Sequence, residues 1–203
     1  MMFLQFFIWG AWFVTLGTYL SSTGFSGTEI GSAFLMNNIG AIISPFFIGL
    51  IADRFFAAEK IMGVLHIAGG LVLYYVSDLT TAGSIIFGLL IYNVCYMPTL
   101  ALANTISFNQ MTSPDTQFPK VRIWGTIGWI VAGLVISYGL AASYNNIETT
   151  AIPMKMAAIA SLVMGLFSFA LPKTPAQNTG KKTTIGDILG LDALALMKDR
   201  SFA

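Results

Sequence analysis

The sequence predicts an all-α membrane protein whose chain crosses the bilayer six times. Of its 203 residues, 56% are hydrophobic and only 9% are charged, with a mean hydropathy of +0.76. Ordinary soluble domains carry about 25% charged residues, and a soluble globule of this length would need far more polar surface. The apolar residues gather in six segments, and the basic residues gather on one side of them. These three observations together indicate a bundle of transmembrane helices.

Six apolar segments are candidate spans, because about 20 apolar residues cross a bilayer as a helix. The third segment is the shortest of the six. The first has neither a basic start nor an A-x-A-like cleavage site, so we interpret it as a span and not as a signal peptide. The segments run about Met1–Leu20, Ile30–Ile51, Ile61–Val76, Ala82–Phe108, Val121–Ala142 and Pro153–Leu171.

The basic residues indicate the orientation of the spans, because loops rich in Lys and Arg stay in the cytoplasm. All of them except Lys155 lie between spans two and three, at the start of span five, or after span six. We therefore expect both ends of the chain in the cytoplasm and the lipid bilayer around the spans. The loops expected to face outward are Ser21–Glu29, Ser77–Thr81 and Ser143–Ile152.

Composition excludes several classes of function. The net charge of +1 and the lack of a basic block exclude nucleic acid as a partner. The single cysteine, Cys95, excludes a disulfide framework and a zinc site. His66 has no second metal ligand at helical spacing, so we expect a packed or interfacial residue. No nucleophile elbow, H-E-x-x-H motif or pair of buried aspartates is present, so we do not expect an enzyme.

The fifth span carries the strongest candidate for a substrate site. Arg122, Thr126 and Trp129 are spaced i, i+4 and i+7, so they share one face of a helix. That face offers a forked cation, a hydroxyl and an aromatic plate, which suit a polar molecule with a flat ring. A charge inside a span is costly and usually faces a polar cavity or a partner. The alternative is that Arg122 only reaches the lipid headgroups, although Lys120 already occupies that anchor position.

Weaker candidates for substrate contact lie in the first and fourth spans. Gln5 and Trp9 share a face of span one, where an amide in hydrocarbon needs a partner. Span four adds Asn93 and Tyr96, close to Pro98, which can kink the helix. The alternative for these residues is helix packing or hydrogen bonding between helices, with no ligand.

In the turn after span two, Gly49 is followed four residues later by Asp53 and then by the basic Arg54. This turn resembles the signature between the second and third helices of the major facilitator superfamily. Phe56 stands where a glycine is usual, and the later basic position is displaced to Lys60. The resemblance implies that Gly49, Asp53 and Arg54 act in gating, with the aspartate helping to latch two halves together on the cytoplasmic side. The alternative is an ordinary charged cytoplasmic turn.

The chain divides into a bundle and a tail. Residues 1–171 hold the six spans, and residues 172–203 form a cytoplasmic linker that continues as an amphipathic helix from about Thr184. Near the end, Lys198-Asp199-Arg200 looks like the flank of a seventh span. We therefore expect the first half of a twelve-span protein, whose C-terminal six-helix bundle lies outside this sequence.

Five stretches of sequence together point to a family. They are Gln5-Phe-Phe-Ile-Trp9-Gly10-Ala-Trp12, Tyr96-Met97-Pro98-Thr99-Leu100, Asn104-Thr-Ile-Ser107, Arg122-Ile-Trp124-Gly125-Thr126-Ile-Gly128 and Leu189-Gly-Leu191-Asp192-Ala-Leu-Ala. In order and spacing, over nearly the whole chain, they resemble the nucleoside:proton symporter family, the bacterial nucleoside permeases of the major facilitator superfamily.

The resemblance implies the N-terminal bundle of the major facilitator fold, built from two inverted three-helix repeats. It implies a nucleoside importer of the bacterial inner membrane that works by alternating access, with the substrate held between two bundles. The nucleoside contacts of the family map onto Arg122, Thr126 and Trp129, and Trp129 stands where phenylalanine is common. The proton is the implied coupling ion, with no other cofactor.

The location of the proton site follows from the acidic residues. No carboxylate of this chain lies deep in a predicted span. A proton-coupled carrier usually needs a titratable group inside the membrane, so we expect acidic residues of the second bundle to take that role. Two other functions stay open: a major facilitator carrier for another polar solute such as a sugar, and a six-span membrane scaffold that transports nothing.

Overall fold

The computed structural model describes residues 1–47, 57–140 and 145–175, and all regular structure among them is helical. Each of the six predicted spans coincides with a helix, which confirms the all-α prediction. The first span comprises two helices, and the fifth ends in a π-helix. The elements are α1 (Met2–Phe13), α2 (Leu16–Ser22), α3 (Gly27–Phe47), α5 (Ala58–Val76), α6 (Ala82–Asn109), α7 (Pro114–Leu134), the π-helix η2 (Val135–Leu140), the 3-10 helix η3 (Ile147–Thr149) and α8 (Ile152–Ser168).

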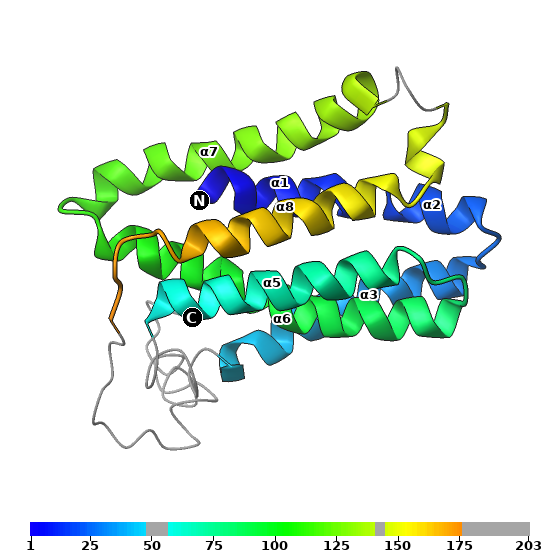
Figure 1. The fold of residues 1–203 in the computed structure, drawn as a ribbon, viewed down its shortest axis with the longest axis horizontal. Coiled ribbons are helices and arrows are strands. Elements are labelled where there is room, and N and C mark those ends of the chain that lie inside the picture. Colours follow the sequence, from blue (N-terminus) through cyan, green and yellow to red (C-terminus); the bar gives the residue numbers. More distant parts are fainter. Residues whose placement is uncertain (48–56, 141–144, 176–203) are drawn as a thin grey trace, which may run out of the picture.

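The helices lie side by side in one bundle, and the chain reverses direction from each span to the next (Figure 1). The helix α1 packs against α7 and α8, α5 packs against α6 and α8, and α3 packs against α6. Spans one, two and three (α1, α3 and α5) can be matched in order to spans four, five and six (α6, α7 and α8). The α1–α7 contact then corresponds to the α6–α3 contact, and the α1–α8 contact corresponds to the α6–α5 contact. The packing therefore has an internal two-fold relation. Because each repeat has an odd number of spans, the second repeat starts on the opposite side of the bundle from the first. The two repeats are therefore inverted.

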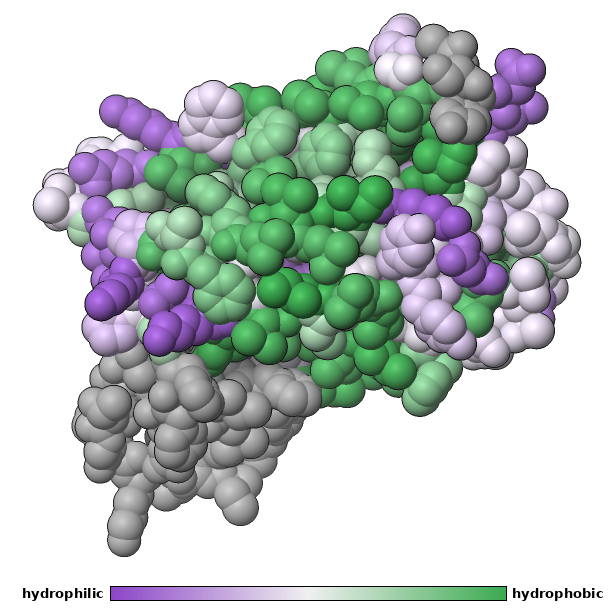
Figure 2. All heavy atoms as spheres, viewed as in Figure 1, coloured by the Kyte–Doolittle hydropathy of each residue, from purple (hydrophilic) through white to green (hydrophobic). Residues whose placement is uncertain are grey.

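The surface has an apolar middle with hydrophilic residues at its two ends (Figure 2). Four stretches of the described chain are long and apolar enough to cross a membrane: Met2–Ser22, Ala58–Val76, Ala82–Asn109 and Pro114–Leu140. The helix α3 has 21 residues but is not one of these four, and α8 is apolar but has only 17 residues. The prediction that the third span is the shortest is wrong, because α5 has 19 residues and α8 has fewer.

The helix α7 begins at Pro114, well before the start predicted at Val121. Proline suits the first helical position, because the N–H that it lacks is not needed there. The side-chain oxygen of Gln117 accepts the backbone N–H groups of the two residues before Pro114, at 3.1 and 3.2 Å. Arg122 therefore lies about two turns inside the helix and not at its start. The residues before Val121 are mostly polar, so no apolar pattern marked them as helical.

The start of the tail returns to the bundle. The backbone N–H of Ala58 donates to the carbonyl of Thr174 (3.0 Å), and the N–H of Thr174 donates to the carboxylate of Glu59 (2.9 Å). Glu59 is only 3% exposed. These bonds hold the first turn of α5, so α5 starts at Ala58 and not at the predicted Ile61. The amphipathic helix predicted from Thr184 lies outside the described residues.

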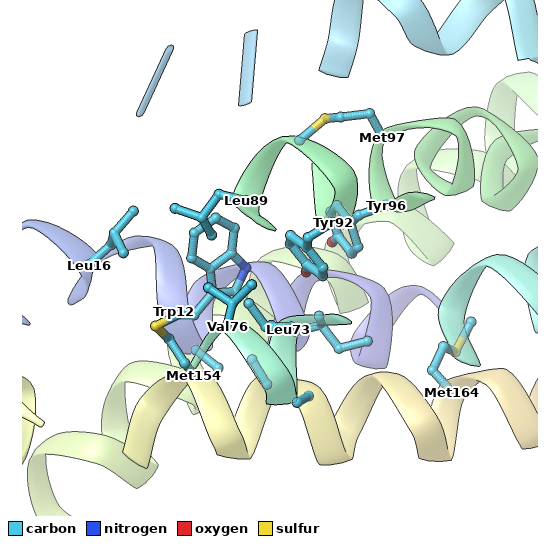
Figure 3. Packing of buried hydrophobic residues seen from close by; sticks show 14 of the residues in the cluster. Trp12, Leu16, Leu73, Val76, Leu89, Tyr92, Tyr96, Met97, Met154 and Met164 are labelled. Atoms are coloured by element: carbon cyan, nitrogen blue, oxygen red, sulfur yellow. The ribbon is translucent and has the colours of Figure 1, made fainter. Parts of the chain in front are cut away.

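The centre of the bundle is an apolar core to which α1, α5, α6 and α8 contribute (Figure 3). The rings of Trp12 and Tyr92 meet edge to face, with centroids 5.2 Å apart, and Tyr96 stacks on Tyr92 at 5.6 Å. Leu73 and Val76 of α5 are fully buried beside them. Aromatic pairs of this kind add to the stability that burial provides. The core thus fixes α1 against α6, one helix away from the predicted substrate residues of α7.

Ser26 caps the start of α3. Its hydroxyl and its backbone N–H both donate to the carboxylate of Glu29, at 2.7 and 2.8 Å, and the N–H of Glu29 lies 3.4 Å from the Ser26 hydroxyl oxygen. This reciprocal arrangement is a capping box. The two donors, the hydroxyl most of all, lower the pKa of Glu29 below its usual value.

We expect Ser26→Ala to reduce the melting temperature of the purified full-length protein at neutral pH, because α3 loses its cap. A carboxyl group with a lowered pKa stabilises the fold above its unfolded pKa, and this stabilisation is lost as the pH falls through the folded value. The difference between wild type and S26A should therefore shrink on acidification. Thermal unfolding over a pH series measures it. Glu29→Gln, which accepts a hydrogen bond but does not titrate, is the control, and a difference that grows on acidification contradicts the prediction.

Candidate substrate-binding face

The residues predicted on the fifth span lie on α7, beside α1. Arg122 and Thr126 are exposed, and Trp129 is half-buried. In the most apolar stretch of the α7–η2 span, only 22% of the residues are buried, whereas the figure for α6 is 56%. The α7–η2 span is therefore less enclosed by other helices than α6. The helix α7 therefore presents polar and aromatic side chains on an open flank of the bundle.

The guanidinium of Arg122 lies over the aromatic ring of Phe6 in α1. Its central carbon is 4.0 Å from the ring centroid, a distance at which a cation is attracted to the face of the ring. Gly125 leaves the room for this contact, because a Cβ there would lie 2.7 Å from both Arg122 Nη1 and Phe6 Cδ2. Arg122 has no hydrogen bond or ion pair with another described residue, so its donors are free to bind a ligand.

Two further glycines let α1 and α7 approach closely. A Cβ at Gly10 would lie 3.1 Å from the carbonyl oxygen of Trp129, and a Cβ at Gly128 would overlap the carbonyl oxygen of Phe3. Small residues allow this kind of backbone contact between spans. The backbones hold Trp129 in place, so its position does not depend on side-chain packing alone.

Aromatic rings continue from α7 through α1 to α6. Trp129 meets Trp9 edge to face, with centroids 5.6 Å apart, and Trp9 lies 6.3 Å from Tyr96. The indole nitrogen of Trp9 is buried without a hydrogen-bond partner among the described residues. The structure therefore brings three of the predicted residues, from three different spans, into one aromatic row.

Gln5 belongs to a buried polar network that sequence reasoning did not find. The network joins Gln5 of α1, His66 of α5, Thr99 of α6 and Ser161 of α8, each at most 1% exposed. The amide nitrogen of Gln5 lies 2.6 Å from Thr99 Oγ1, its amide oxygen lies 2.8 Å from His66 Nε2, and His66 Nδ1 lies 3.1 Å from Ser161 Oγ. The expectation that His66 is a packed residue is confirmed. Polar residues in apolar spans were the available signal, but their partners lie far away in sequence.

Asn93 is not part of this exposed face. Asn93 is fully buried, its side-chain nitrogen donates to the Leu89 carbonyl at 2.8 Å, and its side-chain oxygen has no partner in the described chain. Gly49, Asp53 and Arg54 lie outside the described residues, so their gating role stays a prediction. Among the described residues, no group of three or more His, Cys, Asp or Glu could hold a metal ion.

A recess of about 180 Å³ opens beside Trp129, between the end of α1 and the α7–η2 span. Gly10, Thr15, Gly133 and Glu148 are among its lining residues. Pockets that enclose a small molecule usually have volumes of about 300–1,000 Å³. The recess is therefore too small to enclose a nucleoside-sized molecule by itself.

Three comparisons with known proteins agree with one another. The family model described as nucleoside H+ symporter matches residues 1–203. The chain is 45% identical to the putative nucleoside transporter YegT of Escherichia coli (strain K12), covering 100% of this chain and 48% of that protein. It is 35% identical to the xanthosine permease of the same organism, covering 100% of this chain and 48% of the permease.

The fold is also that of a solved transporter. The crystal structure of a mutant of the nucleoside transporter NupG superimposes with a TM-score of 0.86 at 34% sequence identity, covering 98% of this chain and 49% of that one. The chain thus spans about half the length of the relatives it matches, and it has the fold of the N-terminal half of a major facilitator transporter. It belongs to the nucleoside H+ symporter family.

Proposed function

We propose that this chain is the N-terminal half of a proton-coupled nucleoside importer that works by alternating access. The observation that carries the proposal is the open face of α7, where Arg122, Thr126 and Trp129 lie beside Trp9 of α1. This face is the wall of an incomplete site, and the C-terminal six-helix bundle would supply the other wall. The names of the relatives that share 34% or more of their residues with this chain, which are nucleoside or xanthosine carriers, favour a nucleoside as substrate.

Each residue of the face has a distinct part in this proposal. Trp129 stacks on the base, because a flat heteroaromatic ring and an indole attract each other face to face or offset. Arg122 donates hydrogen bonds from its planar fork to oxygen atoms of the nucleoside, while Phe6 supports its other face. Thr126, one turn away on the exposed side, donates to or accepts from a ribose hydroxyl. The indole N–H of Trp9 has no partner among the described residues, but it is buried, so it reaches substrate only if the bundle rearranges.

The buried candidates support the face from behind. Tyr96 contacts Trp9, and its hydroxyl donates to the backbone carbonyl of Gln5 at 2.5 Å. Gln5 joins α1 to α5 and α6, whereas Asn93 bonds within its own helix. Both are fully buried, so they reach substrate only if the bundle rearranges. Asp53 and Arg54, with Gly49, would form the cytoplasmic latch that opens and closes during transport.

The remaining parts of the proposal concern the membrane and the coupling ion. The chain would lie in the bacterial inner membrane, in contact with lipid, with both ends in the cytoplasm. In support, Lys155, the single basic residue at the predicted outer end, pairs with Asp78 at 2.7 Å. Proton movement down its gradient would drive uptake, with no other cofactor.

Competition of uptake tests the proposed substrate class. Cells without their own nucleoside permeases, expressing the full-length protein, should accumulate labelled uridine, and unlabelled nucleosides should compete while sucrose and glucose should not. An uncoupler that collapses the proton gradient should abolish accumulation. Competition by sugars and not by nucleosides would instead indicate a carrier for another polar solute. No uptake of either class would favour a membrane scaffold.

A further inference from the structure

The hydrogen bonds around His66 leave little freedom in where hydrogens lie. The hydroxyl of Thr99 donates to the carbonyl of Tyr96 at 2.5 Å, so its oxygen has to accept from Gln5. The Gln5 amide must then present its NH₂ group to Thr99 and its oxygen to His66. A carbonyl oxygen only accepts, so His66 Nε2 must carry a hydrogen. One side of the imidazole ring is therefore fixed as a donor.

The other side of the ring meets a group that can reverse its role. Ser161 Oγ lies 3.1 Å from His66 Nδ1 and 2.9 Å from the backbone carbonyl of His66. When Ser161 donates to Nδ1, the ring is neutral. When Ser161 donates to the carbonyl, its oxygen accepts from a protonated Nδ1, and the ring is an imidazolium. The same positions of the heavy atoms satisfy both states, and only the hydroxyl hydrogen of Ser161 turns.

We propose that His66 is a proton-binding residue of the transport cycle, located in the N-terminal half. Binding adds one proton and one positive charge at Nδ1, and release of that proton to water restores the neutral ring. A charged side chain within a span is costly unless its donors are satisfied, and here Gln5 and Ser161 accept from both ring nitrogens. This inference rests on the proposed function, and it adds a site to the acidic residues expected in the other half.

The groups that face His66 do not supply a competing proton acceptor. Gln5 of α1, Thr99 of α6 and Ser161 of α8 are neutral at any physiological pH. The titratable neighbour is Tyr96 of α6, whose ring meets the imidazole edge to face with centroids 5.9 Å apart. The charged side chains of the four helices that meet at the site are Glu59 and Lys60 at the start of α5 and Lys155 near the outer end of α8. On the neighbouring α7, Arg122 lies over Phe6, and Asp115 and Lys120 are nearer the start of that helix. His66 is thus the basic group of this network.

The same residues connect His66 to the substrate-binding face. Gln5 accepts from His66 through its side chain and from the Tyr96 hydroxyl through its backbone carbonyl. Tyr96 in turn contacts Trp9, which meets Trp129. A charge that appears on His66 therefore acts on the groups that hold the aromatic row. Coupling between two sites is reciprocal, so nucleoside binding should also change the proton affinity of His66.

Two transport modes of the full-length protein in proteoliposomes test this inference. Uptake of labelled uridine driven by a pH gradient requires proton coupling, whereas uridine counterflow at equal pH requires only substrate binding and alternating access. His66→Gln keeps a donor toward Gln5 and cannot bind the proton. We expect it to reduce gradient-driven uptake by about fivefold or more, the lower end of ordinary coupling, with counterflow within about twofold of wild type.

Ser161→Ala provides the second variant, and Ser168→Ala is its matched control. Ser168 is buried on the same helix, but its hydroxyl donates to the carbonyl of Met164, within α8 and away from the network. Loss of the Ser161 hydroxyl removes the acceptor of the charged ring, and a hydrogen bond to a charged group is the stronger kind. The pH dependence of gradient-driven uptake should move to lower pH by about one unit in S161A, and S168A should match wild type.

Every outcome of these experiments either supports or overturns the assignment of His66 as a proton-binding residue. H66Q with wild-type pH dependence and uptake overturns the proton site, and H66Q that loses both modes equally shows a purely structural role. If H66Q does not reach the membrane, the comparison of S161A with S168A decides alone, and equal pH profiles overturn the inference. A wild-type protein that carries no uridine in either mode overturns the proposed function, and this inference with it.

Discussion

Replacing Arg122 by alanine in the full-length protein is expected to abolish uridine uptake while the amount of protein in the membrane holds. Removing one partner of a desolvated, hydrogen-bonded charged contact costs about 2–5 kcal/mol, so uptake at low substrate concentration should fall by about thirtyfold or more. The fold should survive, because Arg122 is exposed and its contact with Phe6 is the one described interaction that it loses. Initial rates of labelled uridine uptake, normalised to protein level by immunoblot, measure the effect.

Two further variants distinguish binding from simple charge. Arg122→Lys keeps the charge but loses the planar fork that can donate two parallel hydrogen bonds, so its uptake should lie well below wild type. Lys120→Ala removes the neighbouring exposed cation, which we interpret as a membrane anchor, and should leave uptake nearly unchanged. Normal uptake by R122A would remove Arg122 from the site. An equal loss in K120A would indicate that the positive charge of this region, and not a specific contact, is what matters.

The second large effect is expected from Gly128→Ala. A Cβ at this position would overlap the backbone carbonyl of Phe3, and a backbone group cannot turn away as a flexible side chain can. The helices α1 and α7 must then move apart, and overpacking of this kind costs about 1–3 kcal/mol. We expect a lower melting temperature in detergent, together with weaker uridine uptake, because Trp129 and Trp9 lose their contact.

Gly133→Ala on the same helix is the matched control. No atom lies within 4 Å of a Cβ placed there, so the methyl group is free of contacts. Alanine is favoured over glycine inside a helix by about 0.5–1 kcal/mol, so G133A should equal or exceed the wild type in stability. Similar melting temperatures for G128A and G133A would show that α1 and α7 are not packed as closely as described.

The spans were predictable because hydrophobic composition and segment length act locally. Every apolar segment coincides with a helix, and the run from Ala82 to Phe108 is nearly the whole of α6. The errors fall where polar residues join a helix. The start of α7 at Pro114 depends on the cap from Gln117, and the start of α5 at Ala58 depends on bonds to Thr174, which is distant in the sequence. Neither contact leaves an apolar pattern.

The candidate site was predictable in part. Helical periodicity alone places Arg122, Thr126 and Trp129 on one face, and their polarity within an apolar span marks that face as unusual. It does not show that Phe6 supports the guanidinium or that Trp9 meets Trp129, because those contacts depend on which helix lies beside α7. Glycine spacing indicated close packing of span five but did not name α1 as the partner.

The amino-acid sequence by itself determined the all-α membrane class, the number of spans, the family and the polar face of the fifth span. Each of these follows from composition, local periodicity or matching motifs, which need no knowledge of neighbours in space. Tertiary structure alone decided that Gln5, His66, Thr99 and Ser161 meet. They come from four helices and are separated by as many as 95 residues between hydrogen-bonded partners. A buried polar group needs a partner, but only the packing of the helices decides which group that partner is.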